Sequence, residues 1–219
     1  MKKMIPLAFG LLWLSGCAQP ISTVTDPSSV SPTACCTTLE QLPVQSFNGK
    51  SSRALTFDAQ TPRIALANGS GSARAQLLAL PSYNGAYTLE LTTPLDEKDF
   101  LATEAVIYDA QWQPLQRLAY ADFEYRKPML LENHRLFARM LVQPGINAPR
   151  WLVISTVAHP QPDRLKLVAE SEIYAEKTQV EAPLEQAKYT TASEDGTIRV
   201  RISRFSQLAN ELIDVVTGR

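Results

Sequence analysis

The chain has few of the residues on which most metal and enzyme sites depend. Its 219 residues include three cysteines and two histidines, and His134 and His159 each stand alone in the sequence. Transition metals need several nitrogen or sulfur ligands at suitable spacing, so we expect no metal site. A phosphate-binding glycine loop, a Gly-x-Ser-x-Gly elbow and a His-Glu-x-x-His helix are also missing. We therefore expect neither an enzyme nor a cofactor.

Neither sign of charge is in large excess. The 21 lysines and arginines nearly balance 22 aspartates and glutamates, for a net charge of −1. Without a clustered basic surface we expect no nucleic-acid partner. Asp96, Glu97 and Asp99 could in principle supply paired carboxylates for glycoside hydrolysis. Their position after Pro94, among charged neighbours, favours a solvated loop instead.

Long apolar runs are missing as well, apart from one near the start. Met4–Leu14 is almost wholly apolar, follows two lysines and is too short to span a bilayer. Residues 1–16 thus have the layout of a secretory signal, and the order Leu-Ser-Gly-Cys that ends at Cys17 resembles the bacterial lipobox. We predict a signal peptide over 1–16 and a lipidated Cys17. Ala18 is not the aspartate that typically retains such lipoproteins at the inner membrane, so resemblance to that sorting rule implies the outer membrane. The alternative is a plain signal peptide with an incidental cysteine.

The segment after Cys17 predicts a flexible connection. Residues 17–34 are rich in serine, threonine and proline and show no apolar period, as expected of a tether. Cys35 and Cys36 follow it in what would be an oxidising compartment. Their Cα atoms are about 3.8 Å apart across a trans peptide, closer than in most disulfides. A vicinal disulfide, two reduced structural cysteines, intermolecular pairing and redox chemistry all remain open.

From about residue 50 the apolar residues alternate with polar ones, which is typical of strands. Asn84-Gly85 predicts a hairpin turn between two such strands. In the second of them we expect Tyr87, Leu89 and Leu91 to face the core, and Thr88, Glu90 and Thr92 to face water. Further strands are predicted over 104–109, 114–118, 136–142, 150–157 and 197–203.

The balance of these elements predicts the fold class. Residues 163–179 are predicted to form a charged helix, and apolar residues at helical spacing predict an amphipathic helix over 204–219. Many short strands with one or two short helices after them indicate a mainly β protein. We expect a β-sandwich or jelly-roll-like domain over residues 35–203.

Two tryptophans bear on ligand binding. Sugars present apolar C–H faces that pack on aromatic rings, with polar side chains at the edges. Trp112 lies in a predicted turn, where a tryptophan has little core to enter, and it is our candidate for binding carbohydrate. The alternative is that its ring folds back onto its own hairpin. Trp151 opens an apolar strand and is predicted to lie in the core.

Several short sequence segments between residues 35 and 203 resemble those of a known family. They are Cys35-Cys36, Leu39-Glu40-Gln41-Leu42-Pro43, Val106-Ile107-Tyr108-Asp109, Phe123-Glu124-Tyr125, Arg135-Leu136-Phe137, Trp151-Leu152-Val153-Ile154-Ser155-Thr156, Tyr174-Ala175-Glu176-Lys177 and Gly196-Thr197-Ile198. In these the chain resembles the maltose-operon periplasmic protein family. The resemblance implies an accessory of maltose and maltodextrin uptake that works beside maltoporin and the solute-binding protein, with no established enzymatic activity and no agreed site residues.

Together these observations predict a non-enzymatic accessory of carbohydrate transport in the periplasm. Lipidated Cys17 would anchor it to the outer membrane, and its partner would be a maltodextrin-type carbohydrate. The alternative is a protein-interaction module that docks to maltoporin or other envelope proteins without binding sugar.

Overall fold

The computed structural model of the chain describes residues 35–65, 71–129, 132–143, 148–179, 181 and 186–204. Residues 1–31 and 32–219 form separate units, and every described residue lies in the second. The predicted signal peptide, Cys17, the tether and the C-terminal helix after Arg204 lie outside the described residues.

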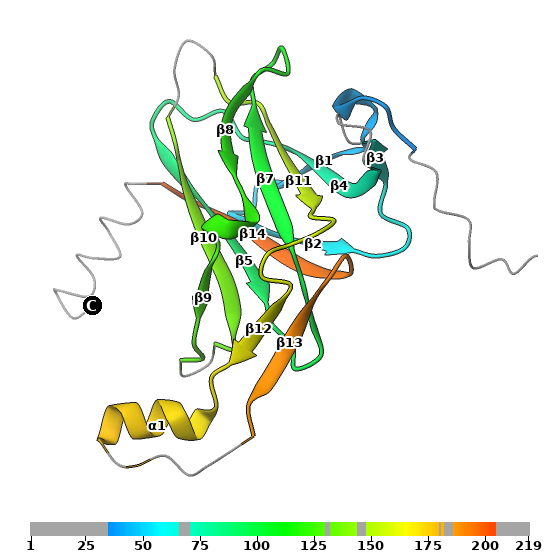
Figure 1. Cartoon of the computed structure of the whole chain (residues 1–219). Coiled ribbons are helices and arrows are strands. Elements are labelled where there is room, and N and C mark those ends of the chain that lie inside the picture. The colour runs from blue at the N-terminus through cyan, green and yellow to red at the C-terminus, as the bar shows by residue number, and fades with distance from the viewer. Residues whose placement is uncertain are drawn as a thin grey trace, which may run out of the picture. The chain divides into compact units, whose positions relative to one another are not determined.

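Two sheets, the first mainly and the second wholly antiparallel, form most of the described structure (Figure 1). In the first sheet, β4 pairs on one side with β11, which is followed by β7 and β8. On its other side β4 pairs in parallel with β1 and antiparallel with β3. The strands of this sheet are β1 (Val44–Ser46), β3 (Arg63–Ala65), β4 (Ser72–Ala79), β7 (Thr103–Tyr108), β8 (Pro114–Leu118) and β11 (Trp151–Thr156).

The second sheet has the order β2-β14-β5-β10-β9, and all its neighbours are antiparallel. Its two central strands come from distant parts of the chain, since β5 pairs with β14 about a hundred residues later. The strands are β2 (Ser52–Phe57), β5 (Tyr87–Pro94), β9 (Glu124–Arg126), β10 (Arg135–Val142) and β14 (Gly196–Arg204).

A small third sheet and three short helices complete the described structure. The third sheet consists of β6 (Asp99–Leu101), β12 (Arg164–Leu167) and β13 (Lys188–Ser193). The helices are the 3-10 turns η2 (Leu39–Gln41) and η3 (Tyr120–Asp122) and the α-helix α1 (Glu170–Thr178). Figure 1 shows α1, β12 and β13 together at one end of the two main sheets.

The main core lies between the two large sheets. Leu78, Leu152 and Ile154 of the first sheet and Leu89 and Val200 of the second belong to one cluster of buried side chains. Apolar residues at alternate positions of each strand supply this core, because successive side chains point to opposite faces. The prediction of a mainly β, sandwich-like fold is confirmed.

The first sheet is also covered on its other face. Cys36 and Leu42, from the segment that precedes β1, pack on Leu77 and Val153 in a second cluster. Consecutive residues are therefore buried in both strands, residues 75–78 of β4 and 152–154 of β11, because both faces are covered.

Strand positions read from alternation are largely confirmed. Predicted strand 114–118 coincides with β8, and those at 104–109, 136–142, 150–157 and 197–203 overlap β7, β10, β11 and β14 with ends shifted by a residue or so. Tyr87, Leu89 and Leu91 are buried as expected. The expectation for Thr88 was wrong, because it is only 5% exposed.

The predicted hairpin at Asn84-Gly85 is wrong. The strands before and after it, β4 and β5, lie in different sheets and share no hydrogen-bonded register. The segment containing Asn84 crosses from one sheet to the other, and Gly85 does not have positive φ. A tight turn with positive φ at both central residues occurs instead at Asn48-Gly49.

The predicted helix over 163–179 is also partly wrong. Its first part is strand β12, which pairs with β13, and only Glu170–Thr178 is helical. Leu165 and Leu167 alternate with Arg164 and Lys166, so a period of two competes there with the helical one. Pairing with β13 and burial of Leu167 decide in favour of the strand.

Candidate functional site

Trp112 occupies the turn between β7 and β8. Asp109, which is 3% exposed, organises this turn by accepting hydrogen bonds from the N–H groups of Gln111 and Gln113, at 2.9 and 2.8 Å. Trp112 itself has a left-handed backbone with φ of 61°. The turn thereby sets the direction in which the Trp112 side chain leaves the backbone.

The Trp112 ring stacks on Trp151 of the neighbouring strand β11. The two ring centroids are 5.3 Å apart and the planes differ by 5°. Tyr108 lies 6.1 Å from Trp112, and the Arg150 guanidinium lies 5.2 Å from the centre of the Trp151 ring. The Trp112 ring therefore packs mainly on a neighbouring strand, and one of its faces is covered.

Both tryptophans are half-buried at the border of the second hydrophobic cluster. Trp151, predicted to be a core residue, thus reaches the edge of that core. The indole N–H of Trp151 is buried without a hydrogen-bond partner among the described residues. We name the surface formed by Tyr108, Trp112, Arg150 and Trp151 the tryptophan platform.

Cys35 and Cys36 form a disulfide in the structure. Cys36 is 3% exposed and its backbone N–H and C=O groups both bond to β3, through Arg63 and Ala65. Cys35 is exposed. The pair therefore lies where the N-terminal segment attaches to the first sheet.

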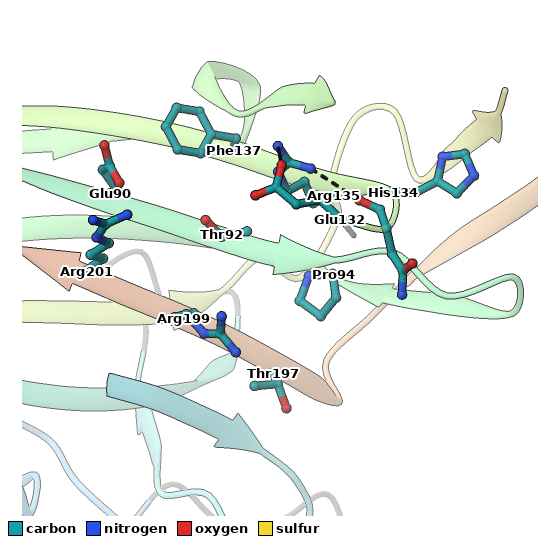
Figure 2. Close-up of a pocket in the computed structure, with 11 residues that line it drawn as sticks. Glu90, Thr92, Pro94, Glu132, His134, Arg135, Phe137, Thr197, Arg199 and Arg201 are labelled. Atoms are coloured by element: carbon teal, nitrogen blue, oxygen red, sulfur yellow. Dashed lines mark hydrogen bonds and ion pairs between the residues drawn. The ribbon is translucent and has the colours of Figure 1, made fainter. Parts of the chain in front are cut away.

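A second candidate surface is a groove on the outer face of the second sheet (Figure 2). Its volume is about 460 Å³. The strands β5, β10 and β14 and the turn before β10 supply its walls. The lining residues are Glu90, Thr92, Pro94, Glu132, Asn133, His134, Arg135, Phe137, Thr197, Arg199 and Arg201. We name it the arginine groove.

The same alternation that builds the core builds this groove. On β14, Ile198 and Val200 are buried in the core, whereas Thr197, Arg199 and Arg201 point to the outer face. Cross-strand pairing places Thr92 beside Arg199 and Glu90 beside Arg201. The groove is therefore a direct product of strand register.

Most charges around the groove are neutralised in pairs. Arg139 binds Glu90 at 2.8 Å, Arg135 binds Glu132, and Arg126 binds Glu124 at 2.6 Å. Beyond Phe137 a second hollow of about 430 Å³ continues along β9 and β10.

The Phe137 ring is covered by cations. The guanidinium carbons of Arg126 and Arg139 lie 5.2 and 5.5 Å from its centre, a distance at which cations are attracted to the ring. Phe137 is therefore less available for stacking against a sugar than its half-exposed position alone would indicate.

One end of the groove is held by a hydrogen-bonded chain. The Val168 N–H donates to the Tyr125 hydroxyl at 3.0 Å, and that hydroxyl lies 2.6 Å from Nδ1 of His134. With His134 neutral, the hydroxyl can donate to Nδ1 while it accepts from Val168. Burial is the main cause that lowers the pKa of His134. The chain thus links β9, the turn before β10 and the residue after β12.

Acidification is expected to destabilise the protein in part through His134. The folded state lowers the pKa of this imidazole, whereas an unfolded histidine titrates near about pH 6.5. The unfolded chain then binds the proton more readily, so stability present above about pH 6.5 is lost as the pH falls through the folded pKa. In His134→Gln, whose amide oxygen can still accept from Tyr125, the change in urea midpoint between pH 7 and pH 5 should be smaller.

His159 supplies the control for this measurement, because it is the other histidine and is exposed. His159→Gln should keep the pH dependence of the wild type. If His134→Gln also keeps it in full, the proposed coupling between His134 and folding is wrong.

The loop that carries Asp96 and Glu97 gives no support for acid–base chemistry. Glu97 is bound by Lys188 at 2.5 Å, and this hydrogen bond is the main cause that lowers the pKa of Glu97. A general acid for glycoside hydrolysis needs the opposite shift. Among the described residues no group of three or more His, Cys, Asp or Glu side chains is placed to hold a metal ion. None of their helices is long and apolar enough to cross a membrane.

Trp112 could be singled out as a candidate from the sequence, whereas the arginine groove could not. Its residues are ordinary outward positions of three strands, and no local motif marks them. Arg199 and Arg201 alternate with apolar residues and could be recognised as surface residues, but their neighbours Thr92 and Glu90 are about a hundred positions away.

No curated protein shows a significant match to the chain. A solved structure, described as "CorA is a surface-associated copper-binding protein important in Methylomicrobium album BG8 copper acquisition", covers 74% of this chain and 98% of its own. Its sequence identity is 10% and its TM-score 0.28, so it carries no inference here.

The family comparison is more extensive. The family described as "Maltose operon periplasmic protein precursor (MalM)" matches residues 70–202, from the start of β4 to near the end of β14. The match takes in most strands of both main sheets and covers more than half of the chain. The chain therefore belongs to the maltose operon periplasmic protein family, a family of periplasmic accessory proteins of the maltose system that is not a known enzyme family.

Proposed function

We propose that this protein is a lipid-anchored, non-enzymatic accessory of maltodextrin transport that binds carbohydrate on the tryptophan platform. Family membership supports a role in the maltose system. The observation that carries the sugar-binding part is the stacked, half-buried pair of Trp112 and Trp151 at a surface turn.

The chemistry of the platform suits a neutral sugar. A glucose ring has an apolar C–H face, which packs favourably on an indole ring. Gln111 and Gln113, which flank Trp112, are exposed and carry amides that can bond sugar hydroxyls. Stacking on Trp151 also holds the Trp112 ring in place before a ligand arrives, which lowers the entropy cost of binding.

The proposed anchor explains how such a protein would stay near its site of action. Two or three acyl chains on Cys17, each buried methylene contributing about 0.8 kcal/mol, would hold it at the membrane. Residues 18–34 would then act as a flexible tether to the folded part. Ala18 favours the outer membrane as the site of attachment.

Trp112→Ala is expected to weaken maltodextrin binding about tenfold or more, because an aromatic contact of about 1.4 kcal/mol corresponds to that factor. Calorimetric titration with maltooligosaccharides of several lengths measures the effect. Tyr174→Ala is the matched control, since Tyr174 is an aromatic residue 66% exposed on α1. That variant should bind as the wild type does.

Two results would count against the proposal. Equal affinities of the wild type and Trp112→Ala, with both folded by circular dichroism, would remove the tryptophan platform as the site. Absence of heat with every maltooligosaccharide would remove maltodextrin binding altogether. Co-purification with maltoporin in that second case would favour the alternative, a docking module that does not bind sugar.

A further inference from the structure

In the part of the chain that the structure describes, the guanidinium of Arg199 in the arginine groove has no counter-charge. Among the residues that the structure describes, the Arg199 side chain makes no hydrogen bond or ion pair, whereas the side chains of Arg135 and Arg139 each bind a glutamate. The neighbours of Arg199 across the sheet are Thr92 on β5 and Ala54 on β2. Both are uncharged and short, so neither neutralises Arg199 nor covers it.

The groove as a whole is positive, although the chain is not. Its lining includes three arginines, Arg135, Arg199 and Arg201, against two glutamates, Glu90 and Glu132. The complete chain has a net charge of −1. Positive charge gathered in a hollow raises the local concentration of anions.

All the cations that line this groove are arginines. A guanidinium donates parallel hydrogen bonds to two oxygens of a carboxylate or phosphate, which an ammonium cannot do with the same geometry. The hydroxyls of Thr92 and Thr197 line the groove on either side of Arg199 and can donate further hydrogen bonds to such a group. Figure 2 shows Arg199 lying between Thr92 and Thr197.

The rest of the groove suits hydroxyl groups. Glu90, Glu132 and Asn133 supply carboxylate and amide groups for hydrogen bonds to a polyol. The volume of about 460 Å³ falls in the range of about 300–1,000 Å³ typical of small-molecule sites.

We propose that the arginine groove binds a sugar that carries a phosphate or carboxylate group, with Arg199 as the residue that binds the anion. This site is separate from the tryptophan platform. It lies on the outer face of the second sheet, whereas Trp112 and Trp151 belong to the first.

The test is calorimetric titration of the purified protein with glucose 6-phosphate, glucuronate, glucose and inorganic phosphate at low ionic strength. Glucose 6-phosphate or glucuronate should bind at least tenfold more tightly than glucose and than inorganic phosphate. Binding should weaken as salt is raised, because an exposed ion pair is screened. Arg199→Gln should reduce the affinity at least tenfold.

Arg117→Gln is the matched control, because Arg117 is an exposed arginine on β8, in the first sheet, where it is paired with Glu104. Loss of binding in Arg199→Gln alone supports the proposal. Equal loss in both variants, equal affinity for glucose, or inorganic phosphate binding as tightly as the anionic sugars would overturn it. Trp112→Ala should leave this binding unchanged, which separates the result from the fate of the tryptophan platform.

Discussion

Gly196→Ala is expected to lower the free energy of unfolding by about 2–5 kcal/mol, from backbone strain and steric overlap together. Gly196 has a φ of 144°, a conformation that side chains with a Cβ rarely adopt. A Cβ placed there would lie 2.9 Å from the Cβ of Leu101. Leu101 is 1% exposed and this contact involves the root of its side chain, so rotation cannot relieve it.

Two other glycines separate the effect of backbone strain from that of steric overlap. Gly49 also has positive φ, at 75°, but a Cβ there would meet no atom within 4 Å, so Gly49→Ala should show the strain alone, about 1 kcal/mol. Gly85 has open space and no positive φ, so Gly85→Ala should be nearly neutral. Urea unfolding measures the change in the free energy of unfolding for all three variants, provided that the dependence of this free energy on urea concentration is the same as in the wild type. Gly196→Ala with a midpoint equal to that of Gly85→Ala would show that β14 can shift away from Leu101.

Cys17→Ser is expected to release the protein from membranes completely. The hydroxyl of serine cannot form the thioether that carries the diacylglycerol, so the acyl chains and their contribution of about 0.8 kcal/mol per methylene are lost together. After detergent phase partitioning of cells that express the full chain, the wild type should be found in the detergent phase and Cys17→Ser in the aqueous phase. Mass spectrometry of the wild-type N-terminal peptide should show an acylated Cys17.

Cys35→Ser is the control for membrane release. It removes a thiol eighteen positions further on, which the structure places in a disulfide with Cys36. Membrane attachment should be unaffected. A wild type that partitions into the aqueous phase, or a Cys17→Ser variant that stays in the detergent phase, would contradict the predicted lipid anchor.

The strands were predictable because their signal is local. Alternation along β14 places Ile198, Val200 and Ile202 in the core and the arginines between them at the surface, whatever the neighbouring strands are. The limits of β8 also agree with those predicted, although Leu118 is the one buried residue of this strand. Period-two alternation reflects one buried face, and most strands of this protein have one.

Strand pairing was not predictable in the same way. Asn84-Gly85 has the composition of a tight turn, yet β4 and β5 pair with β11 and β14 instead of each other. Backbone hydrogen-bonding groups are the same in every strand, so alternation cannot identify the partner. The choice is made by which sheet each apolar face completes.

The tryptophan platform and the arginine groove differ, for the same reason, in how far the sequence predicts them. Trp112 could be singled out from the sequence because its turn is local, but its stacking partner Trp151 comes from a strand about forty residues later. Nothing near Arg199 in the sequence indicates that Thr92 and Phe137 share its groove.

By itself the sequence determined the positions of most strands, the absence of metal-ligand and catalytic motifs, and a family resemblance that the match over residues 70–202 bears out. The lipid anchor at Cys17 stays a prediction from the sequence. These features depend on neighbouring residues or on short sequence segments. Only the tertiary structure decided which strands lie side by side, and with them the tryptophan platform and the position of Arg199 in its groove. Those properties depend on packing between apolar faces far apart in the chain, which no local pattern encodes.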